Sequence, residues 1–151
     1  MSLFFGMPAC KKAKGPANGN SVQPNNNLDS TVGMTATING RDWKSDSAYG
    51  YFVLKSGNDS SNVNLMITAT QKLNDTARTI TFNINNYTGP NSYTINPPFN
   101  TATYYVGNFR HFSDSGIVIV ASDTAYGLRG TFYFKADTFT IAAGRFDVAI
   151  P

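Results

Sequence analysis

The stretch GTFYFKADTFTIAAGRFDVAI, residues 130–150, decides the fold. Apolar and polar residues alternate along it, which is the period of a β-strand that buries one face. The Ala136-Asp137 pair interrupts the alternation and predicts a tight turn between two antiparallel strands. Apolar residues lie at even positions before this turn, at odd positions just after it, and at even positions again from Phe146 onward. Such a change of phase requires one extra residue, so we predict a β-bulge at Ala143-Gly144.

The same alternation recurs in VNLMITA (residues 63–69) and TITFNIN (79–85), which predict half-buried strands. SGIVIVAS (115–122) is apolar on both faces and predicts a central strand covered on each side. Asn39-Gly40 suits a two-residue hairpin turn that would set Ala36 opposite Trp43. No window has helical periodicity of useful length. The sequence therefore predicts an all-β fold, an antiparallel meander of about eight or nine strands forming a sandwich or a flattened barrel.

Before this domain, the only cysteine, Cys10, stands between the hydrophobic MSLFFGMPA and a basic, polar run. This junction is typical of bacterial lipoprotein processing, in which a peptidase cleaves before the cysteine and the sulfur is acylated. We interpret residues 1–9 as a signal-peptide remnant, because a full export signal has roughly 15–30 residues and a charged start. An upstream start, an artificial leader, or an ordinary hydrophobic terminus with a free thiol are the alternatives. Residues 10–32 then form the lipidated cysteine and a flexible linker, and 33–151 a single β domain.

The distribution of charge along the chain agrees with an N-terminal segment that lies near a membrane. The chain has 12 Lys and Arg and 9 Asp and Glu, and three of the lysines, Lys11, Lys12 and Lys14, follow the cysteine directly. Such a cluster favours an anionic lipid surface, at about 1 kcal/mol per lysine. The remainder is nearly neutral and has no basic stripe interleaved with aromatic residues, so we expect no nucleic-acid partner.

Several motifs carry a resemblance to a known family. MTATINGRDWKSD, SGIVIVASD, GTFYFKAD and GRFDVAI together follow a T-x-N-G-x-x-W start, a G-T-F-x-F strand and a G-x-F-D-V finish. This pattern resembles an uncharacterised family of small cell-envelope lipoproteins of Gram-negative, Bacteroides-type bacteria. The resemblance covers most of residues 34–150. It implies a β-rich fold and a lipid-anchored location at the outer membrane, on either its periplasmic or its surface face, but no activity.

Residues suited to catalysis are scarce. The chain has no Glu, one His and one Cys, so a zinc site with its usual ligands cannot be assembled, and we expect no metal or other cofactor. His111 is the single candidate general base, and no nucleophile elbow accompanies it. The pairs Asp42 with Asp46 and Asp114 with Asp123 are the candidate carboxylate pairs, but turns and surface positions explain them better. We therefore expect a protein that is not an enzyme.

Two other patterns suggest recognition rather than catalysis. Tyr87, Tyr93, Tyr104 and Tyr105 cluster around predicted loops, where rings could stack on a sugar or a protein, or simply cover strand edges. Seven of the nine Asp precede Ser or Thr. Turn formation explains this pairing, and a three-residue O-glycosylation signal is the alternative, with acceptors at Ser30, Ser47, Thr76 and Thr124.

Three functions follow as hypotheses. The leading one is a membrane-anchored lipoprotein whose β domain is a non-catalytic binding or interaction module for an envelope protein or a glycan. The second is a carrier of a small apolar ligand inside a barrel, which the many inward Phe residues oppose. The third is a hydrolase that uses Asp residues and His111.

Overall fold

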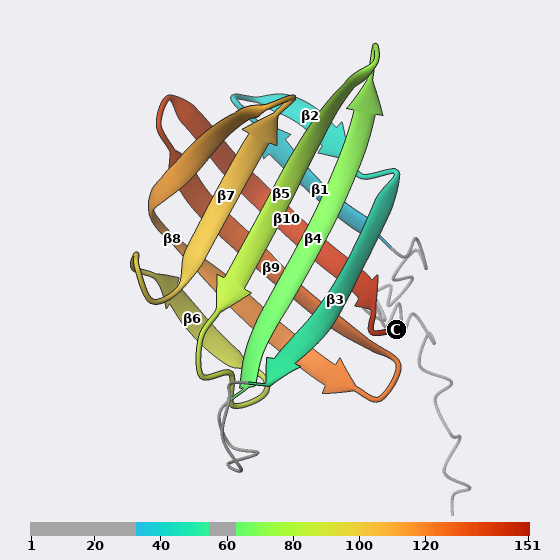
Figure 1. The fold of residues 1–151 in the computed structure, drawn as a ribbon, viewed down its shortest axis with the longest axis vertical. Helices are drawn as coiled ribbons and strands as arrows, with labels where there is room; N and C mark the ends of the chain where they lie inside the picture. Colours follow the sequence, from blue (N-terminus) through green and yellow to red (C-terminus); the bar gives the residue numbers. More distant parts are fainter. Residues whose placement is uncertain (1–32, 55–62) are drawn as a thin grey trace, which may run out of the picture.

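The structure, a computed structural model, describes residues 33–54 and 63–151 (Figure 1). The described residues form strands and no helix. The ten strands are β1 Gly33–Ile38, β2 Arg41–Lys44, β3 Ser47–Leu54, β4 Val63–Leu73, β5 Thr76–Ile84, β6 Asn91–Ile95, β7 Thr101–Val106, β8 Phe109–Thr124, β9 Gly127–Ala136 and β10 Phe139–Ala149. The predicted all-β class is confirmed, with one or two more strands than expected. The predicted signal remnant 1–9 and the linker 10–32, with Cys10 and Ser30, lie outside the described residues.

Seven strands close into a barrel in the order β3, β4, β5, β7, β8, β9 and β10. Neighbours along this path pair antiparallel, as a meander requires, except where the barrel closes. There, β10 meets β3 in parallel through one residue pair, Ala149 with Tyr49. The β1–β2 hairpin extends the sheet beyond β10, and β6 pairs with the second half of β8. The hairpin therefore lies at one end of the barrel, at the top of Figure 1.

The predicted turn and bulge are both confirmed. Asn39 and Gly40 have φ of 48° and 75°, and Ala36 faces Trp43 across the hairpin. Both residues of a type I′ turn need positive φ, which Asn and Gly tolerate best. The register between β9 and β10 shifts after Ile141, where Ala143 has φ of 49°. The extra residue returns the apolar side chains of β10 to the barrel interior.

Aromatic rings fill the centre of the barrel. The Phe82 ring lies 4.9 Å from that of Phe132 and 5.6 Å from that of Phe134, in edge-to-face geometry. Ile80 and Leu65 are fully buried beside them. The alternation in residues 63–69 and 79–85 accordingly produces a continuous core.

The prediction for residues 115–122 is wrong in one respect. Val118 and Val120 are buried, but Ile119 on the other face is 38% exposed. The strands β9 and β6 pair with the two edges of β8, and neither covers its outer face. A strand in a single barrel wall has only one inner face, so the continuous apolar run does not indicate burial on both sides here.

Candidate functional site

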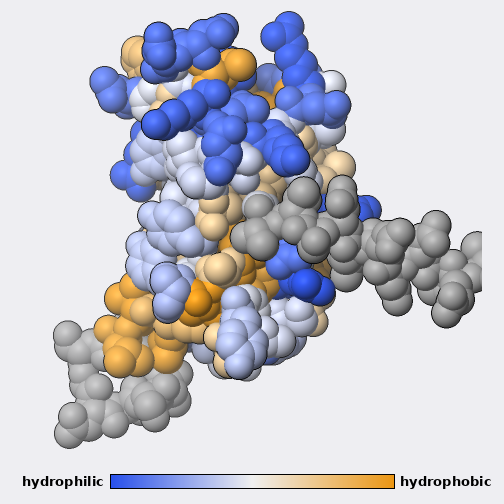
Figure 2. Space-filling model, turned by 90° about the vertical axis from the view of Figure 1, so that its right-hand side faces the viewer, coloured by the Kyte–Doolittle hydropathy of each residue, from blue (hydrophilic) through white to orange (hydrophobic). Residues whose placement is uncertain are grey.

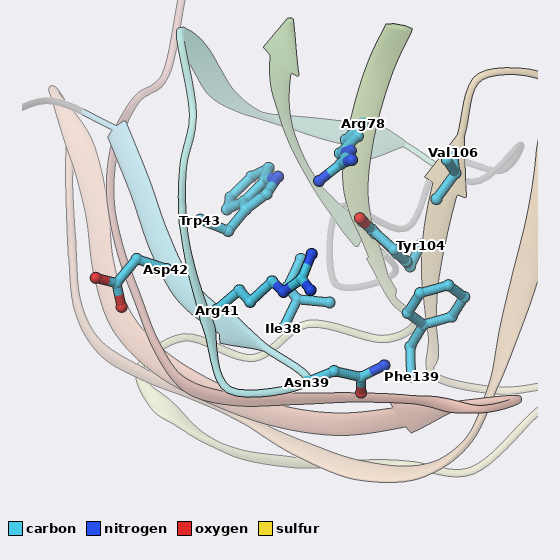
Figure 3. A pocket seen from close by; sticks show the side chains of 9 residues that line it. All are labelled: Ile38, Asn39, Arg41, Asp42, Trp43, Arg78, Tyr104, Val106 and Phe139. Carbon is cyan, nitrogen blue, oxygen red and sulfur yellow. The ribbon is translucent and has the colours of Figure 1, made fainter. Parts of the chain in front are cut away.

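A recess of about 440 Å³ opens at the end of the barrel that the β1–β2 hairpin covers (Figure 3). Its walls come from β1, β2, β5, β7 and β10. The lining side chains are those of Ile38, Asn39, Arg41, Asp42, Trp43, Arg78, Tyr104, Val106 and Phe139. A volume of this size lies within the range of about 300–1,000 Å³ that small-molecule sites occupy.

The hairpin holds its position through Asn39. The backbone N–H of Asn39 donates to the carbonyl oxygen of Thr140 at 2.9 Å, and the N–H of Thr140 donates to Asn39 Oδ1 at 2.8 Å. Because these bonds join the turn to the start of β10, one wall of the recess is fixed to the barrel. Side chains at i and i+2 share a face of a strand, so Arg41 and Trp43 both face the recess. Asp42 lies on the opposite face and its carboxylate points away (Figure 3).

Arg78 interrupts an otherwise apolar row of β5. Ile80, Phe82 and Ile84 are the inward-facing residues of this strand and are fully buried. Arg78 has the same parity and lies opposite Val106 of β7, so its side chain faces the recess above the core. A charged residue in an inward-facing row breaks the pattern that specifies a barrel, and such local conflicts concentrate at functional sites.

Two donors in the recess have no acceptor. Trp43 Nε1 and Arg78 Nε are buried, and neither has a hydrogen-bond partner among the described residues. The Trp43 side chain as a whole is only 3% exposed. An unsatisfied buried donor costs about 1–3 kcal/mol. A third unpartnered atom, Asn83 Oδ1, does not line the recess.

The side chains that line the recess carry a net positive charge. Within the described ranges neither Arg41 nor Arg78 forms an ion pair. The hydroxyl of Tyr104 points toward Arg78 (Figure 3). Burial raises the pKa of Tyr104, and the charge of Arg78 partly opposes that rise. The phenol therefore remains protonated at neutral pH and adds a further donor.

His111, the candidate base, lies behind one wall of the recess and does not line it. Its Nδ1 is 2.7 Å from Asp137 Oδ2, and its ring lies 4.7 Å from that of Phe139 and 6.3 Å from that of Tyr104. Within the described ranges Asp137 is the only side chain hydrogen-bonded to His111. The imidazole therefore packs against Phe139, and no nucleophilic side chain among the described residues is hydrogen-bonded to it.

The four tyrosines singled out in the sequence do not form one surface. Tyr87 and Tyr93 are buried at the end of the barrel away from the recess, with ring centroids 5.4 Å apart. The hydroxyl of Tyr87 donates to Asp123 at 3.0 Å and that of Tyr93 to the carbonyl of Gly89 at 2.6 Å. Tyr105 lies outside the barrel, 5.7 Å from the guanidinium of Arg110. Tyr104 alone lines the recess.

The aspartates and hydroxyls of the sequence pattern lie at strand ends. Asp46 Oδ2 accepts the Lys72 N–H at 2.6 Å, which joins the start of β3 to β4. Thr124 Oγ1 donates to the Gly127 carbonyl in the β8–β9 turn. Ser47 and Thr76 begin β3 and β5. These positions support the turn-forming interpretation of the Asp-Ser/Thr pairs, and the glycosylation alternative stays a prediction.

Sequence reasoning missed Arg41, Trp43 and Arg78 as site residues. A signal was present for Arg78, which stands in phase with three apolar residues in TARTITFNI. A signal was also present for Trp43, because it is the only tryptophan of the chain. Their convergence depends on the hairpin folding over the barrel end, which no local pattern indicates.

A second surface feature lies along β3. Beyond the single bridge at Tyr49, the edge of β3 that faces β10 has no partner strand in the described structure. Its outward residues Tyr49, Tyr51 and Val53 are 46%, 37% and 42% exposed. Figure 2 shows apolar surface gathered toward the lower end of this side of the molecule.

In the described part of the chain, no three His, Cys, Asp or Glu side chains are grouped to hold a metal ion. No helix among the described residues is long and apolar enough to cross a membrane. Comparison with protein-family models, with curated proteins and with solved structures found no match to this chain.

Proposed function

We propose that this protein is a non-catalytic binding module that takes a small ligand into the hairpin-covered recess. The observation that carries the proposal is the pair of buried donors, Trp43 Nε1 and Arg78 Nε, which lack acceptors and belong to two side chains that line the same recess. Buried polar groups in proteins are nearly always hydrogen-bonded, and exceptions call for a specific cause. A ligand that supplies acceptors removes the cost of both.

The alternative of an apolar ligand inside the barrel has less support. Such a carrier needs an unfilled interior, and the rings of Phe82, Phe132 and Phe134 occupy the centre of this one. The recess lies above that core and mixes charged, polar and apolar lining. A hydrolase is supported still less, since His111 contacts Asp137 and Phe139 and no nucleophile.

We also propose that the module is carried at the cell envelope, anchored in the outer membrane by a lipid on Cys10. The support is in the sequence: the hydrophobic stretch before Cys10, the three lysines after it, and the family resemblance. An envelope protein or a glycan that presents the ligand group remains the proposed partner. Labelled palmitate should enter the natively expressed chain and should not enter a Cys10→Ser variant. A variant that still fractionates with membranes contradicts the anchor and leaves the recess proposal intact.

Binding to the recess can be followed directly, because Trp43 is the only tryptophan in the chain. We expect a panel of small metabolites, containing neutral sugars, organic acids, amino acids and phosphates, to include compounds that shift Trp43 emission saturably. The same compounds should raise the melting temperature.

A Trp43→Phe variant keeps an aromatic ring but loses the N–H, so thermal shift should report weaker binding to it. Tyr133→Phe, on the outer face of β9, is the matched control and should bind as the unchanged chain does. Compounds that stabilise the protein equally in the Trp43→Phe variant, or a panel with no binder at all, contradict the proposal.

A further inference from the structure

We infer, resting on the proposed function, that the ligand carries an anionic group, a carboxylate or a phosphate, that binds between Arg78, Arg41 and the indole N–H of Trp43. Three features of the recess support this assignment: its uncompensated positive charge, its excess of side-chain donors over acceptors, and its apolar walls.

The first feature is the uncompensated positive charge of two arginines. Arg78 is half-buried, its Nε is unpartnered, and no carboxylate pairs with it in the described structure. Arg41 projects into the same space from the facing hairpin (Figure 3). The partly buried guanidinium of Arg78 beside an aromatic core is unfavourable unless an opposite charge joins it, and the exposed Arg41 adds positive charge to the same space. Arginine also presents a planar set of N–H donors that matches a carboxylate or a phosphate in two parallel hydrogen bonds.

The hydrogen-bonding groups of the recess narrow the chemical class of the ligand further. Arginine and tryptophan side chains donate and cannot accept. Asp42, the only carboxylate in the lining, points away from the space that the two arginines share (Figure 3). A neutral sugar hydroxyl both donates and accepts, so it satisfies fewer of these donors than an ionised group does, and its own hydrogen needs an acceptor such as the Tyr104 hydroxyl oxygen. An ionised carboxylate or phosphate accepts only, and it fits this donor set.

The apolar walls indicate that the anion is part of a larger molecule. Ile38, Val106 and Phe139 line the recess beside the charged groups. A bare inorganic anion would leave much of a recess of about 440 Å³ empty. An organic acid with an apolar or ring portion would place its charge on the arginines and its carbon skeleton against these three side chains.

The test uses three phenyl compounds that differ in charge and head group, together with inorganic phosphate, which lacks the ring. Benzoate, phenyl phosphate, benzamide and inorganic phosphate are titrated separately into the full chain, with Trp43 emission and calorimetry as the two readouts. We expect benzoate or phenyl phosphate to bind, and benzamide to bind about five- to tenfold more weakly, because hydrogen bonds to charged groups are stronger than neutral ones. Whichever of benzoate and phenyl phosphate binds more tightly identifies the head group that the recess prefers.

Three variants assign the effect to the recess. Arg78→Gln and Arg41→Gln should each weaken the acid by about ten- to hundredfold, the range expected when a charged hydrogen bond is lost. Arg145→Gln, on the exposed face of β10, should leave affinity unchanged. If Arg78→Gln fails to fold, Arg41→Gln decides the outcome, because Arg41 is exposed and its loss leaves the core intact.

The outcomes separate the two proposals. Equal binding of benzamide and benzoate, or no loss in either recess variant, overturns the anion assignment while a ligand in the recess still stands. Binding of inorganic phosphate as tight as that of phenyl phosphate overturns the role of the apolar walls. If neither these probes nor the wider metabolite panel bind, the proposed function fails as well.

Discussion

At the scale of single residues, Arg78 is the clearest departure from the pattern that builds the barrel. Every other described inward position of β5 from Ile80 onward is apolar and fully buried. Residues retained for binding often lower stability, because a site must keep groups that the folded chain alone does not satisfy. If Arg78 serves a ligand, its removal should stabilise the empty protein.

We therefore predict that Arg78→Met raises the free energy of unfolding by about 1 kcal/mol, since the substitution removes an unsatisfied buried donor and keeps the apolar stem. Chemical denaturation of the ligand-free chain measures this difference. Arg145→Met, on an exposed strand face, should change stability by less than about 0.5 kcal/mol. A clear loss of stability in Arg78→Met would mean that the arginine supports the fold itself.

At the scale of elements, the β1–β2 hairpin is the part that makes a site out of an open barrel end. It pairs with β10 along one edge, and two hydrogen bonds through Asn39 attach its turn to Thr140. The side chain of Asn39 thus helps to position the donors of the recess by fixing the hairpin to the barrel, without contacting those donors itself. Its loss should affect both the stability of the hairpin and the affinity of the recess.

We predict that Asn39→Gly lowers the free energy of unfolding by about 1 kcal/mol, the net value of one hydrogen bond. Glycine keeps the positive φ that this turn requires, so the change removes the side-chain acceptor without straining the turn. Asn39→Asp retains an acceptor oxygen and should lose less. Urea denaturation gives the stability, and Trp43 emission reports whether the indole stays buried. Equal losses in both variants would show that the acceptor to Thr140 contributes nothing.

The loops at the other end of the barrel contain a second polar link, from Tyr87 after β5 to Asp123 near the end of β8. Burial raises the pKa of Tyr87 well above its ordinary value of 10.0, and the hydrogen bond and charge of Asp123 raise it further. The folded state therefore holds a proton that the unfolded chain releases near pH 10. This contribution is complete below pH 10 and is lost as pH rises beyond it.

We predict that stability falls above pH 10 by at most about 1.4 kcal/mol per pH unit for this one group. Tyr87→Phe should make the slope shallower, because the ionising group is gone. Tyr126→Phe is the control, since the Tyr126 side chain is 87% exposed. Urea denaturation between pH 8 and 11 measures the slopes. Part of the slope should persist in Tyr87→Phe, because burial also raises the pKa of Tyr104.

At the scale of the whole molecule, the local elements were more predictable than their closure. Alternation, the Asn39-Gly40 turn and the bulge at Ala143 are encoded within a few residues, and the sequence predicts each of them. Closure depends on β3 meeting β10 through one pair, Tyr49 with Ala149, a hundred residues apart. No periodicity specifies that contact. The recess shares this difficulty, since Trp43 and Arg78 become neighbours only after the hairpin covers the barrel end.

The same weak closure leaves an open strand edge far from the recess. Backbone donors and acceptors of β3 beyond Tyr49 face no strand in the described structure, and Tyr51 and Val53 project beside them. An exposed edge with apolar residues is a template for pairing with another strand. The tandem rings of Tyr49 and Tyr51, 6.0 Å apart, add a rigid apolar surface.

We predict that the chain self-associates through this edge at high protein concentration, and that Tyr51→Lys suppresses the association, because a charge on an edge strand opposes pairing. Sedimentation velocity over a hundredfold range of concentration measures the change in mean mass. Tyr126→Lys is the matched control, with the same chemistry at an exposed turn, and it should associate as the unchanged chain does. A chain that stays monomeric throughout, or equal suppression by both variants, contradicts the prediction. Because β3 ends at the barrel end away from the recess, Tyr51→Lys should leave ligand affinity unchanged, so one molecule can use both surfaces independently.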